Sequence, residues 1–572
     1  MPTIYSVCTG ENRVFFLCLA FSSLFMLLIT IFADVMNIPV KVQVSDLHSR
    51  RRMMQVAAGK YCDGTLYPDL CASMVSAIPD LPAKSLPEVI CHTVNSTAGA
   101  VRNAAKNFTD YLRRHDGHLD PRQGVALADC LELFAQTLDE LDEASAGLAD
   151  SDPATRADDV ETVLSAAITN QYTCLDGFAY VGGGGYRSAI QRRLLHVTRL
   201  VSNSLAMMKR IRRRRRRGAL EAGEAGGFPA WVPGRDRRLL QAPAANTTTT
   251  ANTTTTITPD LVVAKDGSGN FTTISDAVAA APNNTVGRFV IYVKAGAYFE
   301  NVEVGKSKAN LMIIGDGIGN TVVKASRNVV DGWTTFRSAT FAVVGNGFLM
   351  RDMTIENAAG PSKHQAVALR VSADLAVFYR CSFVGYQDTL YVHSLRQFYR
   401  DCDVYGTIDF VFGNAAVVLQ GCNLYARRPL PNQQNIFTAQ GREDPNQNTG
   451  ISIHKCKVAA AADFIPVQAN FSTFLGRPWR EYSRTVFMQS YFDSLIDPTG
   501  WTEWNGTFAL ATLYYGEYMN RGPGANTTNR VTWPGFTVIT SDAEASNFTV
   551  AAFIQGDQWL DSTSMPITLG LN

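Results

Sequence analysis

The sequence predicts a two-part protein, in which an all-α helical bundle is followed by an all-β domain built as a parallel β-helix. Before residue 208, apolar residues recur at spacings of three and four, as on one face of an amphipathic helix. After residue 261, short runs rich in Val, Ile and Phe alternate with Gly, Asn and Asp. There Cys381, Cys402 and Cys422 recur at spacings of 21 and 20 residues, which suits one coil of a β-helix. A β-sandwich would place its turns at roughly half that period.

The composition is that of a globular protein with more than one folded unit. The chain has 572 residues, too many for one ordinary core, and 46% of them are hydrophobic and 18% charged. The formal net charge of +1 gives no global attraction for nucleic acid. We therefore expect no nucleic-acid partner.

Residues 1–40 are expected to be a hydrophobic signal or signal-anchor segment. The run from Val14 to Ala33 carries no charge, and its length is compatible with both a transmembrane anchor and a long cleaved signal. Asn-x-Ser/Thr sequons on both sides of the linker agree with passage through the secretory pathway. They include Asn95, Asn107, Asn246, Asn252, Asn470 and Asn547. The sequence thus predicts a secreted glycoprotein with an extracellular body.

Residues 55–208 are expected to form the helical bundle. One apolar face is defined by Leu127, Leu131, Phe134, Leu138 and Leu141. Similar stretches at Leu164–Tyr172 and Ser188–Met208 predict further helices packed against it.

Residues 209–260 are expected to be a linker. Arg212–Arg217 cannot pack into a core and must be solvated, and a Thr-rich, low-complexity segment follows. Such an arginine run often marks nuclear localisation, but the hydrophobic leader argues against that reading. In a secreted chain we expect sites for a processing protease here, at the arginine block and at Arg237, Arg238, Leu239 and Leu240.

Residues 261–572 are expected to form the β-helix, whose repeat places two acids in register. Asp388 in GYQDTLY and Asp409 in GTIDFVFG are 21 residues apart, which is one coil. Equivalent positions on adjacent coils lie roughly 5 Å apart, and two carboxylates that close cannot both ionise easily. One pKa rises while the other stays low, as for an acid beside a base or nucleophile.

Other side chains complete a candidate site around these acids. Gln387 adjoins Asp388, and Gln365 lies one coil earlier, so their amides could donate hydrogen bonds to an oxyanion. Arg477 can hold a carboxylate through two hydrogen bonds, and the indole of Trp479 suits stacking on a sugar ring. Four further aromatic side chains are expected to line the cleft: Tyr386, Tyr391, Phe410 and Phe412. No CxxC or His-rich spacing predicts a metal site.

The motifs that carry these residues resemble those of the plant pectin methylesterase (pectinesterase) family. They include AGPSKHQAVALR, FVGYQDTLYVHSLRQFYRDC, GTIDFVFGNAAVVLQ and LGRPWREYSRTV, and the likeness covers essentially all of Leu261–Asn572. Upstream, four cysteines in the helical region resemble the inhibitor-like pro-region of such enzymes: Cys62, Cys71, Cys130 and Cys174. The RRLL at 237–240 resembles the processing motif between the two parts.

The resemblance implies a right-handed parallel β-helix behind a four-helix bundle, and hydrolysis of the C6 methyl esters of homogalacturonan with release of methanol and without a cofactor. It implies Asp409 as the nucleophile, Asp388 as the proton donor and later the base, and Gln387 as the transition-state stabiliser. Substrate-contacting positions would be Thr335, Gln365, Arg477 and Trp479. The bundle would keep the enzyme silent or retained until a protease removes it, and separate inhibitor proteins are further expected partners.

Disulfides are expected at the four bundle cysteines and once in the β-helix. The ladder of Cys381, Cys402 and Cys422 allows only one neighbouring pair to bond. We favour Cys402–Cys422, with Cys381–Cys402 as the alternative.

Two other functions are compatible with the sequence. Paired acids on a β-helix also serve polygalacturonases, although His364 and His393 lie here without the clustered acids of those glycosidases. The chain could also be an inhibitor or carbohydrate-binding protein without catalysis, with the bundle as its active part.

Overall fold

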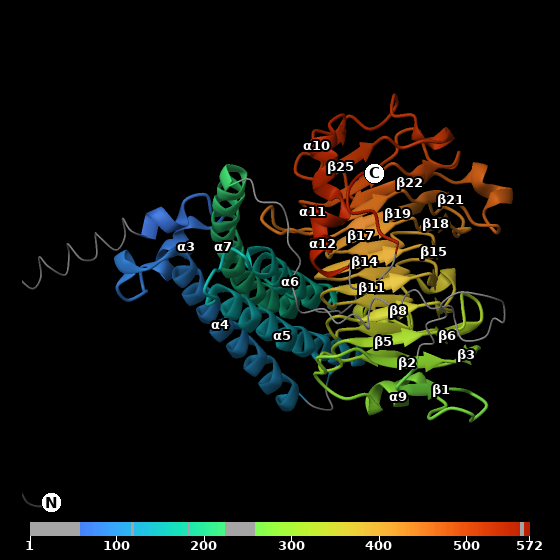
Figure 1. Ribbon diagram of the computed structural model, residues 1–572, viewed down its shortest axis with the longest axis horizontal. Coiled ribbons are helices and arrows are strands. Elements are labelled where there is room, and N and C mark those ends of the chain that lie inside the picture. Colours follow the sequence, from blue (N-terminus) through green and yellow to red (C-terminus); the bar gives the residue numbers. More distant parts are fainter. Residues whose placement is uncertain (1–57, 116–118, 180–183, 223–257, 561–565) are drawn as a thin grey trace, which may run out of the picture.

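A bundle of long helices lies against the side of a β-helix in the computed structural model (Figure 1). The structure describes residues 58–115, 119–179, 184–222, 258–560 and 566–572, with the backbone alone at 184–189 and 212–222. The predicted fold class is confirmed. The predicted signal segment and the processing residues at 237–240 lie outside the described residues. Within these residues, no helix has the length and apolar character needed to cross a membrane.

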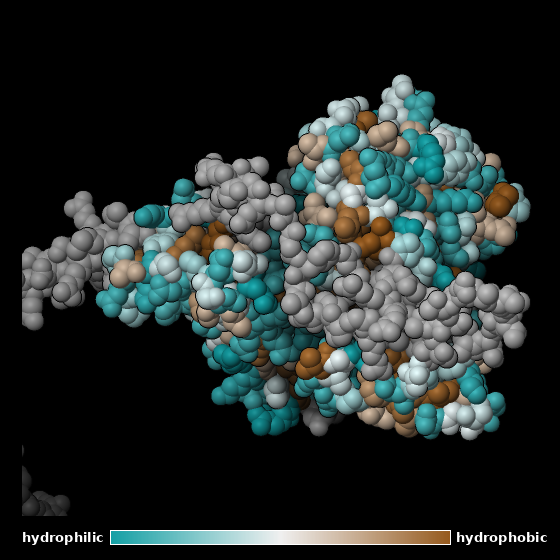
Figure 2. Space-filling view, viewed as in Figure 1, coloured by the Kyte–Doolittle hydropathy of each residue, from teal (hydrophilic) through white to brown (hydrophobic). Residues whose placement is uncertain are grey.

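In the described part of the chain, four long helices form the bundle, and short helical segments precede them, the first at residues 58–62. The helices that follow it are α3 (Pro68–Val75), η1 (Leu81–Ala83), α4 (Leu86–Arg114), α5 (Pro121–Leu148), α6 (Ala157–Asp176) and α7 (Gly184–Ala222). Helix α4 begins at a capping box, in which Ser85 and Glu88 each accept the other's backbone N–H. The predicted apolar stripe reaches the core at Leu127, Phe134 and Leu141. The visible outer face of the bundle is largely hydrophilic, as amphipathic helices require (Figure 2).

Two disulfides fasten the bundle at the predicted cysteines. Cys62 is bonded to Cys71, and Cys130 is bonded to Cys174. The second bond joins α5 to the last turn of α6. It therefore fixes the end of α6, which faces the β-helix.

Helix α7 extends further than the sequence predicts. Its backbone remains helical to Ala222, through Arg212–Arg217, where a linker is expected from residue 209 onward. Arginine is a good helix former, and a helix that continues into solvent needs no core partner. Solvation of the arginine block therefore does not require irregular structure.

The β-helix consists of three parallel sheets. Sheet I contains β1 (Leu261–Val263), β2 (Phe289–Val293), β5 (Leu311–Ile314), β8 (Leu349–Arg351), β11 (Ala376–Tyr379), β14 (Arg396–Arg400), β17 (Ala416–Gln420), β20 (Gly450–His454), β23 (Arg484–Met488), β25 (Tyr514–Tyr518) and β26 (Phe536–Val538). Sheet II contains β4 (Val302–Val304), β7 (Phe341–Val343), β10 (Leu369–Val371), β13 (Leu390–Val392), β16 (Val411–Gly413), β19 (Asn435–Gln440) and β22 (Thr473–Pro478). Sheet III contains β3 (Gly296–Tyr298), β6 (Thr321–Ala325), β9 (Thr354–Asn357), β12 (Ser382–Val384), β15 (Asp403–Gly406), β18 (Asn423–Ala426), β21 (Lys457–Ala460) and β24 (Tyr491–Phe492).

The coils repeat at the period that the sequence predicts. Leu390 pairs with Val411 in sheet II, and Ser382 pairs with Asp403 in sheet III, both 21 residues apart. Inward side chains of successive coils therefore stack on one another, because equivalent residues lie directly above each other. The next coil is 20 residues long in sheet I, where Arg396 pairs with Ala416.

Short helices cover the β-helix at its start and along sheet I. Helix α9 (Ile274–Ala280) packs against β1, β2 and β4 at the first coils. The C-terminal helices α10 (Asp542–Ala545), α11 (Val550–Ile554) and α12 (Gly556–Trp559) pack on the outer face of sheet I. The 3₁₀ turns are η2 (Phe336–Ser338), η3 (Pro361–Lys363), η4 (Ile465–Asn470), η5 (Pro523–Ala525) and η6 (Ser546–Phe548).

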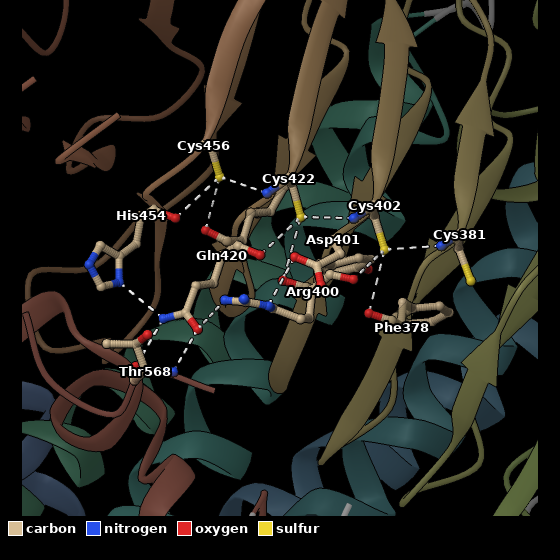
Figure 3. A network of polar contacts seen from close by, with 12 residues as sticks. Phe378, Cys381, Arg400, Asp401, Cys402, Gln420, Cys422, His454, Cys456 and Thr568 are labelled. Atoms are coloured by element: carbon tan, nitrogen blue, oxygen red, sulfur yellow. Dashed lines mark hydrogen bonds and ion pairs between the residues drawn. The ribbon is translucent and has the colours of Figure 1, made fainter. Parts of the chain in front are cut away.

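The predicted Cys402–Cys422 disulfide is wrong, and so is its alternative Cys381–Cys402, because these cysteines and Cys456 are buried free thiols. They form a ladder on successive coils (Figure 3). The backbone N–H of Cys381 donates to Cys402 Sγ (3.4 Å), and that of Cys402 donates to Cys422 Sγ (3.4 Å). Stacked side chains point the same way from strands about 4.8 Å apart, whereas a disulfide needs Cβ atoms that converge to roughly 3.8 Å.

Candidate active site

Asp388 and Asp409 lie at equivalent positions on adjacent coils, each two residues before a strand of sheet II. The pairing of Leu390 with Val411 sets this register, and the N–H of Asp388 donates to Ile408 O (3.0 Å). Both acids have left-handed backbone, with φ of 63° and 52°. Aspartate tolerates this conformation better than most residues, but it remains uncommon, and such positions cluster at functional sites.

Arg477, on β22, holds Asp409 with both arms of its guanidinium. Its Nε donates to Asp409 Oδ1 (2.9 Å) and its Nη2 to Asp409 Oδ2 (2.6 Å). This two-bond geometry fixes the carboxylate plane and favours its ionised form. The Arg477 guanidinium also lies over the ring of Trp504, with its Cζ 4.3 Å from the ring centroid.

The two acids differ in which form their surroundings favour. Burial raises the pKa of Asp388 well above its usual value, and the charge of Asp409 raises it further. Burial also raises the pKa of Asp409, but the charge and hydrogen bonds of Arg477 oppose that shift. Asp388 is therefore the member of the pair that keeps a proton, and Asp409 is the member poised as a carboxylate.

The predicted catalytic and substrate-contacting residues all line one cavity of about 330 Å³. Its wall includes Thr335, Gln365, Gln387, Asp388, Asp409, Arg477 and Trp479. Residues from η2, from the turns before β10, β13 and β16, and from β22 thus meet in one place. Thr335 and Trp479 are far apart in the sequence, so stacking of the coils, and not local spacing, brings the site residues together.

Outward side chains of sheet II form the floor of this cavity and continue beyond it. Register pairs Arg370 with Tyr391, Tyr391 with Phe412, Phe412 with Ala439, and Ala439 with Arg477. These five define what we call the floor row. The neighbouring residues on the same strands, such as Leu390 and Val411, point into the β-helix core.

Two of the predicted cleft aromatics lie elsewhere. Phe410 is fully buried and packs on Phe437, with ring centroids 4.9 Å apart, so it belongs to the core. Tyr386 is not among the cavity residues and instead accepts a hydrogen bond from Arg427 Nη2 (2.8 Å). Tyr391 and Phe412 do line the cavity.

Trp504 is a cavity residue that the sequence reasoning missed. It lines the cavity and is 37% exposed, which is unusual for an indole. The signal available in the sequence was its place in GWTEWNG, where a second tryptophan follows a turn glycine closely. Only Trp501 of that pair is used in the core.

The helical bundle contributes a further part of the cavity wall. The cavity is lined by Thr173 and Asp176 from the last turn of α6, by Gly177 and Ala179 just after it, and by Arg122 from the start of α5. The bundle also packs directly on the floor row, since Tyr391 and Phe412 share one apolar cluster with the bundle core.

Ion pairs and hydrogen bonds hold the bundle to the β-helix. Acids of α5 and α6 bind arginines of the β-helix: Asp129 and Glu132 with Arg337, Asp159 with Arg396, and Asp176 with Arg480. Neutral contacts lie between them: Thr173 with His393 (2.9 Å), Thr169 with Asn414 (2.8 Å) and Ser165 with Gln447 (2.8 Å). The interface thus joins an acidic bundle face to a basic face of the β-helix.

The cavity chemistry is that of carboxylates, amides and a guanidinium. In the part of the chain that the structure describes, no group of three or more His, Cys, Asp or Glu side chains could hold a metal ion.

Comparisons with known proteins match both parts of the chain. The family model described as Pectinesterase matches residues 260–557, and that described as Plant invertase/pectin methylesterase inhibitor matches residues 58–207. "Pectinesterase 1" of Citrus sinensis is 51% identical over 526 residues, which cover 89% of this chain and 88% of that protein. "Pectinesterase/pectinesterase inhibitor 3" of Arabidopsis thaliana is 48% identical, with 89% and 90% covered. The solved "Pectin methylesterase from Carrot" is 59% identical with a TM-score of 0.55, over 56% of this chain and 100% of that one.

Proposed function

The chain belongs to the pectinesterase family, and from this premise we propose that it hydrolyses pectin methyl esters through an acyl-enzyme intermediate, an anhydride on Asp409. As a family member it is a carboxylic ester hydrolase that acts on pectin. The observation that carries the mechanism is the pair of acids in register, of which only Asp409 is held by the Arg477 fork. This membership replaces the glycosidase and the non-catalytic alternatives.

The first half of the reaction uses the two acids in different forms. A carboxylate oxygen of Asp409 attacks the carbonyl carbon of the C6 methyl ester, and the bond to the methoxy oxygen breaks. Asp388 gives its proton to that oxygen, so methanol leaves as a neutral molecule. The acyl group is now bound to Asp409 as an anhydride.

The second half returns both acids to their starting forms. Asp388, now a carboxylate, takes a proton from water, and the resulting hydroxide attacks the acyl carbon. The bond to Asp409 breaks, which releases the free galacturonate carboxyl group and restores the Asp409 carboxylate. Arg477 orients Asp409 throughout and keeps its pKa from rising to that of Asp388.

Amide and aromatic side chains around the acids would hold the substrate. Gln387 and Gln365 line the same cavity, where their N–H groups can stabilise the oxyanion that forms at each attack. Trp479 offers a flat apolar surface for a sugar ring, and Thr335 a hydroxyl group.

The bundle would keep the uncleaved enzyme inactive. It covers the floor row and lines the cavity at Thr173 and Asp176, where a polymer would have to lie to reach Asp409. Cleavage at Arg237–Leu240, or at the arginine block, would separate the two parts. The hydrophobic leader and the sequons support action outside the cell, after passage through the secretory pathway.

The reaction is tested by incubating the protein, cleaved in the linker, with highly methylated pectin. We expect methanol to appear without new reducing ends. Reducing ends without methanol would overturn the esterase assignment.

Latency is tested by comparing methanol release from the uncleaved and the cleaved chain at equal concentration. We expect the rate of methanol release to increase strongly on cleavage. The intact linker holds the bundle close to the floor row, whereas a cleaved bundle can dissociate and expose it. Equal rates would show that the bundle does not inhibit. N-terminal sequencing of the secreted protein locates the cleavage site in the same preparation.

A further inference from the structure

We propose that the β-helix carries a second carboxylate-binding site, formed by Arg337 and Arg370, for galacturonate residues that have already lost their methyl ester. In the uncleaved chain the bundle acids Asp129 and Glu132 occupy this site. The inference rests on the proposed removal of the bundle, and it assigns to the exposed surface a ligand of a definite chemical class.

The floor row places this site along the path of the substrate. Arg370 stands on β10 in the same outward row as Arg477 on β22, with Tyr391 and Phe412 between them. Four strand spacings separate the two arginines, or about 19 Å at roughly 4.8 Å each. A polymer that crosses sheet II over the reacting ester therefore reaches Arg370 a few sugar residues away.

Carboxylates already bind there in the uncleaved chain. Arg337 Nε donates to Asp129 Oδ1 (2.9 Å), and its Nη2 contacts Glu132 Oε2. Glu132 also approaches Arg370, with its Oε1 3.9 Å from Arg370 Nη2. The two acids come from adjacent turns of α5, so the site accommodates two carboxylates side by side.

Arg370 depends on the bundle for a counter-charge. Its guanidinium is buried and lies 3.5 Å from the ring centroid of Phe336, and Nη1 donates to Ser372 Oγ (3.3 Å). Its Nε has no hydrogen-bond partner among the described residues. No carboxylate of the β-helix forms an ion pair with it in the described part of the chain.

Arg337 is almost as dependent, whereas a third arginine of the same face is not. Among the described residues of the β-helix, Glu303 is the only acid that forms an ion pair with Arg337, at an N to O distance of 3.6 Å. Arg396 keeps two hydrogen bonds to Asp374 (3.0 and 2.6 Å) whether or not the bundle is present. Loss of the bundle therefore leaves Arg337 and Arg370 short of counter-charge together, next to the cavity residue Phe336. Arg480 also loses a bundle acid, Asp176, and keeps Glu443 at 3.6 Å, but it lies apart from this pair of arginines, after β22.

A free carboxylate can satisfy these two guanidinium groups, but a methyl ester cannot. The ionised group offers two oxygens that accept paired, charge-assisted hydrogen bonds, whereas the ester is neutral. The site thus selects the product of the reaction over its substrate. Bound there, an already hydrolysed residue would hold a neighbouring ester of the same polymer over Asp409.

The experiment uses the full chain with a site-specific protease sequence in place of residues 237–240 and with Asp409→Ala to prevent turnover. After cleavage and separation of the bundle at high salt, calorimetry measures the Kd of a fully de-esterified and of a fully methyl-esterified oligogalacturonide. We expect Arg337→Gln and Arg370→Gln each to weaken binding of the de-esterified oligomer, relative to the esterified one, by at least about tenfold. Arg370→Lys should recover part of this loss, and added salt should reduce the preference.

Arg380→Gln is the matched control, because Arg380 is bound to Asp352 at the turn between β11 and β12, away from sheet II. It should leave the ratio of the two Kd values unchanged. If the separated domain does not stay folded, the cleaved complex serves instead, and the de-esterified oligomer should displace the bundle in gel filtration. An unchanged ratio in both the Arg337 and the Arg370 variant, or no displacement, overturns this inference. Methanol release by the cleaved enzyme with Asp409 intact tests the proposed function separately.

Discussion

Two clusters of acids and arginines lie on the same face of the β-helix, but they differ in where their members come from. In the cavity, Asp388, Asp409 and Arg477 all belong to coils of the β-helix. Beyond the cavity, Arg337 and Arg370 belong to the β-helix, while their acids belong to helix α5 of the bundle. The first cluster is therefore permanent, and the second exists only while the bundle is docked.

If the bundle inhibits as proposed, this difference would allow one surface to be both stable and regulated. A buried arginine that loses its carboxylate is strongly destabilised, so the cavity needs all of its members on one covalent framework. At the interface, Arg337 and Arg370 also need carboxylate partners, so docking of the acidic bundle is favourable. Once the bundle leaves, the same two arginines can bind another anion. The bundle acids would then inhibit by resembling the ligand that replaces them.

The largest effect is expected from Asp409→Ala in the cleaved chain. Without a nucleophile, methanol release should fall by about 10³-fold or more, since the remaining groups can only orient water. Stopped assays of methanol measure this directly. The parallel substitution Asp409→Asn keeps the shape beside Arg477, and wild-type activity in either variant would remove Asp409 from the mechanism.

A smaller loss of activity, combined with a gain in stability, is expected from Asp388→Asn. Loss of the proton donor should slow methanol release by about 10²-fold, less than loss of the nucleophile. Because the pKa of Asp388 is raised in the folded protein, the unfolded state binds fewer protons above about pH 3.9, and this acid makes folding less favourable as pH rises. The variant should therefore melt at a higher temperature than the wild type at pH 7.

The stability difference should shrink as pH falls and vanish below about pH 3.9, where Asp388 is protonated in both states. Thermal melts at three or four pH values check this. In wild-type enzyme, kcat/KM should fall at high pH as Asp388 loses its proton. A variant that melts lower at pH 7, with no pH dependence of the difference, would contradict the raised pKa.

The sequence predicted the permanent cluster in the cavity far better than the divided cluster, whose arginines belong to the β-helix and whose acids belong to α5. The 21-residue repeat placed Asp388 and Asp409 in register, because one coil of a parallel β-helix transmits sequence spacing directly into space. It failed at Phe410, since the left-handed backbone of Asp409 precedes the strand and breaks the alternation that would put Phe410 and Phe412 on one side. Contacts between α5 and the β-helix have no period, so nothing in the sequence pointed to Glu132 and Arg370.

An intermediate effect is expected when the divided cluster is broken in the uncleaved chain. Glu132 contacts both Arg337 and Arg370, so Glu132→Gln should loosen the bundle and raise latent methanol release by about tenfold. Asp142→Asn is the matched control. This acid of α5 is exposed, and its ion-pair partner, Arg102, belongs to the bundle and not to the β-helix. Equal activity of both variants would show that charge at the interface does not hold the bundle in place.

The smallest effect is expected from Cys402→Ser. This substitution tests a difference between the two regions, since the β-helix has free thiols and the bundle has disulfides. A serine hydroxyl can accept a hydrogen bond from the N–H of Cys381, as the thiol of Cys402 does. A serine already has this role one step beyond Cys456, where the N–H of Cys456 donates to Ser490 Oγ (3.1 Å). The melting temperature of the β-helix should therefore change little. If a Cys402–Cys422 disulfide were present instead, closing a loop of that length would contribute about 3 kcal/mol, and its loss would lower the melting temperature by several degrees. Cys130→Ser provides the contrast in the same calorimetric scan, because it removes a disulfide that the bundle has, worth about 4 kcal/mol by the same reasoning.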